Sequence, residues 1–127
     1  MGEVLGIVYR VIAGHLVKKA GETQTSARTG AVTLIQRFGS ALNLNIHFHM
    51  LFLDGVYVEE RERLRFRRVK APERAELEAL VQSLSERVGR HLERRGLLER
   101  DAENGYLALE PEGEEALAQA LNSSALP

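Results

Sequence analysis

The chain contains no cysteine and no tryptophan, and only 3 of its 127 residues are proline. The absence of cysteine excludes disulfide bonds, a cysteine nucleophile and thiolate zinc or iron–sulfur sites. Aromatic residues make up only 6% of the chain, which predicts an aliphatic core. Any metal site therefore depends on histidine, carboxylate or amide ligands.

The chain also lacks an excess of charge of either sign. It has 17 Lys and Arg residues against 18 Asp and Glu, and its net charge is −1 with neutral histidine. Attraction to nucleic acid must therefore come from local clusters rather than from the whole chain. The apolar runs are far shorter than the roughly 20 residues that cross a bilayer, and the N-terminus lacks the order of a signal peptide. We expect a cytoplasmic protein with no membrane contact; its oligomeric state stays open.

Apolar residues recur at steps of three and four in several segments, which is the period of one helical face. The predicted helices cover residues 3–20, 72–96 and 111–121. Gly21 and Gly96 follow the first two as stop signals. The polar segment 22–30 is predicted to be a loop.

β-branched and alternating residues predict the strands. These strands cover residues 31–38, 45–53, 56–58 and 64–69, and a small hairpin joins 97–99 to 106–109. Asp54-Gly55 is typical of a tight turn. The length allows one compact α+β domain, with an antiparallel sheet of about four strands, flanking helices and a C-terminal hairpin-helix appendage.

We expect three parts within that domain. Residues 1–30 form an N-terminal helix and loop, residues 31–96 form the sheet and main helix, and residues 97–127 form the appendage.

His47 and His49 are the most informative residue pair. Alternation in a strand puts both imidazoles on one face, with Cβ atoms roughly 6–7 Å apart, so both rings can reach one cation. With an oxygen ligand the pair suits Mn²⁺, Zn²⁺ or, with waters, Mg²⁺. Gln36, Asn45 and Asp54 are candidates for that ligand, although turn chemistry also explains Asp54. Taken alone, two alternate histidines also fit a half-buried polar strand face.

A stripe of arginines follows the predicted third strand. Its members are Arg61, Arg63, Arg65 and Arg67. Their spacing of about 7 Å is close to that of phosphates in a single strand, which makes them candidate DNA contacts. The alternative is a solvated edge strand whose charges block unwanted pairing.

The segment from Thr33 to Val58 reads TLIQRFGSALNLNIHFHMLFLDGVYV. It closely resembles the core of the two-tyrosine HUH transposases of the insertion-sequence-91 type, which move by rolling-circle transposition. The family's Gln-Arg-Phe-Gly-Ser-Ala-Leu-Asn-Leu-Asn run corresponds to residues 36–45, its histidine triplet to 47–49 and its Asp-Gly turn to 54–55. The two long predicted helices resemble the family more loosely.

The resemblance implies a ferredoxin-like antiparallel sheet, with the histidine pair on a central strand. It implies a divalent metal ion, Mg²⁺ or Mn²⁺, that polarises a scissile phosphate in single-stranded DNA. In the family, a tyrosine attacks that phosphate, stays linked to the 5′ end and leaves a free 3′ hydroxyl. Reversal of this step on another strand rejoins the DNA, as DNA transposition and recombination require.

The sequence departs from the family at two points. The family's tyrosine pair and its Cys-rich zinc module have no counterpart here, so we expect a partial transposase domain that binds but does not cleave. Tyr9, Tyr57 and Tyr106 are better explained by packing. Two alternatives stay open: a non-catalytic winged-helix-like DNA-binding module formed around residues 92–117, and an inert structural remnant.

Overall fold

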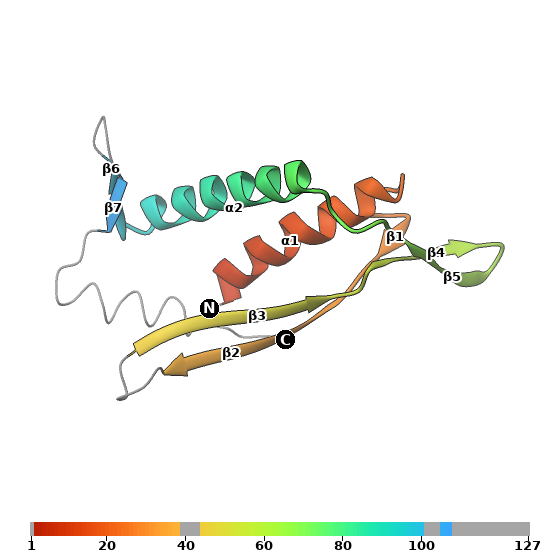
Figure 1. Cartoon of the computed structure of the whole chain (residues 1–127), viewed down its shortest axis with the longest axis horizontal. Coiled ribbons are helices and arrows are strands. Elements are labelled where there is room, and N and C mark those ends of the chain that lie inside the picture. Colours follow the sequence, from red (N-terminus) through yellow and green to blue (C-terminus); the bar gives the residue numbers. More distant parts are fainter. Residues whose placement is uncertain (1, 39–43, 101–104, 108–127) are drawn as a thin grey trace. The chain divides into compact units, whose positions relative to one another are not determined.

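The structure is a computed structural model that describes residues 2–38, 44–100 and 105–107. Figure 1 shows the elements in chain order. They are α1 (Gly2–Lys19), β1 (Ala27–Arg28), β2 (Ala31–Phe38), β3 (Leu44–Phe52), β4 (Gly55–Glu60), β5 (Arg63–Arg68), α2 (Arg74–Arg94), β6 (Leu98–Arg100) and β7 (Gly105–Leu107). Helices together with antiparallel strands confirm the predicted α+β class.

Both long helices end where the sequence predicts. Gly21 and Gly96 have φ angles of +76° and +72°, in the left-handed region that glycine adopts without steric cost. The amide of Glu22 donates to the carbonyl of Val17, and the amide of Leu97 donates to that of Leu92. These bonds satisfy carbonyls that the last helical turn leaves unpaired.

Contacts divide the chain into two compact units, Met1–Ile12 with Pro72–Pro127, and Ala13–Ala71. We call them the helical unit and the strand unit. In the helical unit, the apolar face of α1 is buried at four residues, Val4, Leu5, Ile7 and Val11. On α2, the half-buried apolar residues are Leu80, Leu84, Val88 and Leu92, whereas Leu77 and Val81 are exposed.

Ion pairs also link the two helices of the helical unit. Glu3 near the start of α1 accepts from Nε2 of His91 at 3.2 Å and from Nη1 of Arg95 at 3.3 Å. His91 lies on α2 and Arg95 is its C-cap residue. His91 is half-buried.

The strand unit has its own small apolar core. The buried members are Leu16, Val17, Ala27, Val56, Val58 and Val69. They come from the end of α1, from β1 and β4, and from the segment that follows β5. This core lies away from the described part of the β2–β3 pair, whose side chains are at most half-buried.

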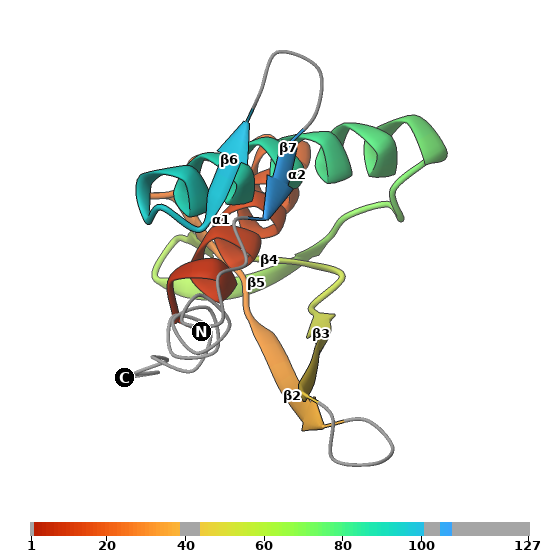
Figure 2. The ribbon, with the colours of Figure 1, turned by 90° about the vertical axis from the view of Figure 1, so that its left-hand side faces the viewer.

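The strands of this unit form two sheets rather than the single sheet expected. One has the order β1-β4-β5 and the other pairs β2 with β3, and all pairs are antiparallel. Figure 2 shows β2 and β3 as a ribbon of their own. A two-stranded sheet, β6 with β7, belongs to the helical unit and confirms the predicted hairpin.

The break between the two sheets lies at Asp54-Gly55, and the prediction of a tight turn there is wrong. The chain does not reverse: β3 continues into β4 while their partners β2 and β1 run alongside in the opposite direction. Thr29 Oγ1 donates to the carbonyl of Gly55 at 2.8 Å, which replaces a ladder bond at the break. The predicted loop over 22–30 likewise contains the short strand β1, because Ala27 and Arg28 pair with β4.

A reversal does occur between β4 and β5. Glu60 pairs with Arg63, which leaves Arg61 and Glu62 as a two-residue hairpin loop. Their φ angles are +50° and +64°. Positive φ at both central residues is the signature of a type I′ turn, which matches the twist of the flanking strands.

Two further expectations concern the C-terminal part of the chain. The predicted helix over 111–121 lies outside the described residues. The winged-helix alternative requires a helix-turn-helix ahead of the hairpin, but the described residues between α1 and α2 form strands.

None of the described helices is long and apolar enough to span a bilayer.

Candidate metal and nucleic-acid site

The two histidines lie on the same face of the β2–β3 pair. His47 is directly opposite Gln36, and His49 is directly opposite Leu34. Residues opposite one another in an antiparallel pair project to the same side, and so do alternate residues along one strand. His47, His49 and Gln36 therefore share one face, and all three side chains are exposed.

That face is open to solvent beyond the histidines. Its apolar neighbours are Val32, Leu34 and Leu51, which are 65%, 68% and 76% exposed. The opposite face of the same pair carries Phe48 and Met50, which are half-buried. A large molecule can therefore approach the histidine face without displacing any described side chain.

The donor set on this face fits a metal with open coordination positions. Two imidazoles one pleat apart can bind one ion, and Gln36 adds an amide beside His47. The described residues contain no group of three or more His, Cys, Asp or Glu that could enclose an ion.

Asp54 and Asn45, the other two candidate metal ligands, are less well supported than Gln36. Asp54 forms an ion pair with Arg68, with 2.9 Å between Oδ2 and Nε, and lies at the break between the sheets. The side chain of Asn45 lies outside the described residues. Gln36 is therefore the candidate that the described strand register brings closest to the pair.

The arginine stripe divides into two groups. Arg63, Arg65 and Arg67 alternate along β5, an edge strand whose six residues are all exposed. Arg61 lies in the β4–β5 turn instead of the strand. Arg61, Arg63 and Arg65 line a hollow of about 510 Å³ together with Glu60. Arg65 also lies 3.9 Å from Glu60, measured from Nε to Oε2, a loose surface pair that an anion in the hollow would compete with.

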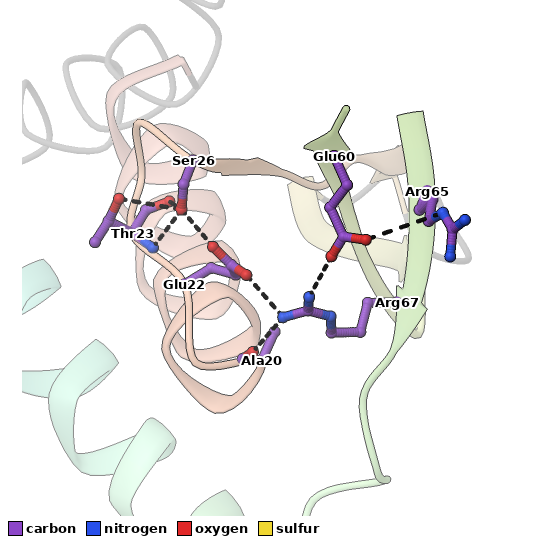
Figure 3. A network of polar contacts seen from close by, with 7 residues as sticks. All are labelled: Ala20, Glu22, Thr23, Ser26, Glu60, Arg65 and Arg67. Atoms are coloured by element: carbon purple, nitrogen blue, oxygen red, sulfur yellow. Dashed lines mark hydrogen bonds and ion pairs between the residues drawn. The ribbon is translucent and has the colours of Figure 1, made fainter. Parts of the chain in front are cut away.

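Arg67 is held in a polar network, drawn in Figure 3, that reaches the hollow only through Glu60, which also pairs loosely with Arg65. Its Nη1 donates to Glu22 at 2.7 Å and to the carbonyl of Ala20 at 3.2 Å, and its Nη2 donates to Glu60 at 2.8 Å. Glu22 also accepts from Ser26 at 2.6 Å. Arg67 therefore fastens β5 to the segment that follows α1, which the sequence pattern does not indicate.

An aromatic pair that the sequence does not predict lies on the three-stranded sheet, on the face opposite Arg63, Arg65 and Arg67. Tyr57 and Phe66 are opposite one another, with ring centroids 5.1 Å apart. They are 44% and 43% exposed. Arg28 is opposite Tyr57 on the third strand and completes a row across the sheet. Alternation along each strand predicts on which face each ring lies. Only the pairing of β4 with β5 across their turn places the two rings side by side.

Comparison with known protein families gives one match. Residues 30–116 match the model of a family described as "Putative transposase". The match includes the histidine face and the arginine stripe. No curated protein and no solved structure matches the chain.

Proposed function

Because the chain belongs to this transposase family, which spans residues 30–116, we propose that it binds single-stranded DNA and a divalent metal ion in rolling-circle DNA transposition. The observation that carries the proposal is the position of His47 and His49 on one solvent-exposed face. An HUH-type site needs both imidazoles to face the same way and to be accessible to a DNA backbone.

In this proposal His47 and His49 would hold the ion, with the amide oxygen of Gln36 as the candidate third ligand. Mg²⁺ and Mn²⁺ are the proposed ions, because water and phosphate oxygens, which suit both ions, would occupy the positions that the two imidazoles leave open. A bound ion would supply Lewis-acid chemistry by neutralising charge on the oxygens of a scissile phosphate. The exposed apolar neighbours of the histidines leave space for the nucleotides on either side of that phosphate.

Two further features support an unpaired strand as the DNA substrate. Tyr57 and Phe66 present exposed rings, and unstacked bases gain roughly 1–3 kcal/mol each by stacking on aromatic side chains. Arg61, Arg63 and Arg65 surround one hollow, where phosphates of the same strand can bind. Duplex DNA offers phosphates but no free base faces.

The proposal assigns binding and positioning, but no nucleophile, to this chain. Tyr9 belongs to α1, Tyr57 to β4 and Tyr106 to β7, so no two of them stand together as the family's tyrosine pair does. The chain by itself is thus expected to bind DNA without nicking it. Strand cleavage and joining would need a tyrosine supplied from elsewhere.

Fluorescence anisotropy with a labelled mixed-sequence oligonucleotide tests the proposal. Single-stranded DNA should bind more tightly with Mn²⁺ than with EDTA, and more tightly than the same sequence as a duplex. His47→Ala and His49→Ala should each abolish the Mn²⁺ effect, whereas His91→Gln on α2 should keep it. Equal affinity with Mn²⁺ and EDTA for the wild-type chain would overturn the metal-dependent part of the proposal.

A further inference from the structure

A pocket lined by arginines lies within the helical unit. It has a volume of about 200 Å³, and its lining residues are Ile7 and Arg10 of α1 with Arg87, Arg90 and Arg94 of α2. None of these described lining residues is acidic. The pocket shares no residue with the histidine face or with the arginine stripe on β5.

The arrangement of the four guanidinium groups follows from helix geometry. Arg87, Arg90 and Arg94 are three and four residues apart, so they share one face of α2. Arg10 comes from α1, and its side chain turns back over Gly6. A Cβ atom at Gly6 would lie 2.9 Å from Nη1 of Arg10, so the glycine leaves room for that guanidinium against the helix.

The charges in this pocket are poorly compensated. Among the described residues, Arg10, Arg87 and Arg94 have no ion-pair partner. Arg90 has one, Glu86, at 3.7 Å, and both side chains are more than half exposed, so the pair is weak. Like charges gathered in one place repel one another, and an anion bound between them would relieve that repulsion.

The geometry points to a phosphate-binding pocket, and we propose that its ligand is the backbone of a DNA strand. Guanidinium groups present paired donors that match phosphate oxygens, which makes arginine well suited to this ligand. The net charge of −1 provides no general attraction to DNA, so affinity must come from local clusters such as this one. The choice of DNA over a free phosphate compound rests on the proposed function.

Matched charge variants test this inference. Arg94→Gln and Arg10→Gln each remove one pocket charge, from different helices. Arg74→Gln removes one charge from the same helix α2 outside the pocket, where Arg74 pairs with Glu78 at 3.0 Å. Thermal unfolding followed by circular dichroism identifies the variants that are folded. If one pocket variant does not fold, the other still tests the pocket.

The readout is the salt dependence of oligonucleotide affinity, measured in EDTA so that the histidine site does not contribute. For single-stranded DNA, each pocket variant should reduce the slope of log K against log salt by about 0.7, the amount expected for one lost phosphate contact. Arg74→Gln should leave the slope at its wild-type value. If the two pocket variants have the same slope as Arg74→Gln, the inference is overturned. This holds even if Mn²⁺ strengthens binding through the histidine face.

A second arm separates DNA from small phosphate compounds. Inorganic pyrophosphate is titrated into the wild-type chain and into Arg94→Gln, with the phosphorus NMR signal as the readout. Binding of pyrophosphate that depends on Arg94, together with a DNA slope that does not, would overturn DNA as the ligand. A DNA slope that depends on Arg94 supports the inference whether or not Mn²⁺ strengthens binding, so its failure and that of the proposed function are distinguishable.

Discussion

Arg67 and Arg63 lie on the same face of β5 but should respond differently to substitution by glutamine. Arg67 bridges Glu22 and Glu60 and also donates to the carbonyl of Ala20. Arg63 lines the open hollow beside Arg61 and Arg65. Arg67→Gln should therefore reduce stability, whereas Arg63→Gln should reduce DNA affinity.

The size of the stability effect follows from exposure and geometry. Arg67 and Glu60 side chains are 42% and 43% exposed, so solvent screening holds their pair to the 0.2–1 kcal/mol typical of surface pairs. Glu22 is only 17% exposed and lies 2.7 Å from Arg67, which makes that pair the stronger one. We expect Arg67→Gln to cost about 1–2 kcal/mol and Arg63→Gln less than about 0.5 kcal/mol.

Urea unfolding and salt titration of single-stranded DNA binding measure the two effects independently. Arg63→Gln should lower the salt slope by about 0.7, and Arg67→Gln should leave it unchanged. Equal slope changes in both variants would refute the division of the stripe. So would an unfolding midpoint for Arg67→Gln that equals that of the wild type.

Three further predictions concern the strand unit. Gly55→Ala should destabilise the chain by about 1–3 kcal/mol in urea unfolding, because the new Cβ would lie 2.8 Å from Cζ of Phe66 and even closer to a backbone oxygen; an unchanged midpoint contradicts this packing. Glu62→Gly should stabilise it by about 0.5–1 kcal/mol, because φ at this position is +64°; a loss of stability argues against the turn type. Tyr57→Ala should weaken single-stranded but not duplex DNA binding in anisotropy, about tenfold, and an equal loss for both rules out base stacking.

Local patterns predict the elements of this fold well. The strand over residues 31–38 and the ends of both long helices follow from side-chain period and glycine position, which depend on near neighbours in the chain. The common face of His47 and His49 likewise follows from strand alternation alone, and β-pairing opposite Gln36 agrees with it. These features need no knowledge of distant residues.

Long-range pairing accounts for what the sequence left open. Asp54-Gly55 is typical of a turn, but the partners β1 and β2 continue past it and hold the chain extended. The role of Arg67 depends on Glu22, which is 45 residues away in the sequence. The arginine pocket requires residues from two helices that lie far apart in the sequence, so no local pattern reveals it.

His47 and His49 together are proposed to bind one divalent ion. Isothermal titration of Mn²⁺ into the chain without DNA tests it most directly, with His47→Ala, His49→Ala and the control His91→Gln alongside. We expect one ion bound per wild-type chain and per His91→Gln chain, and loss of that binding in either of the other two variants. A wild-type chain that binds no ion, or variants at positions 47 and 49 that bind it as the wild type does, would contradict a metal site at these two histidines.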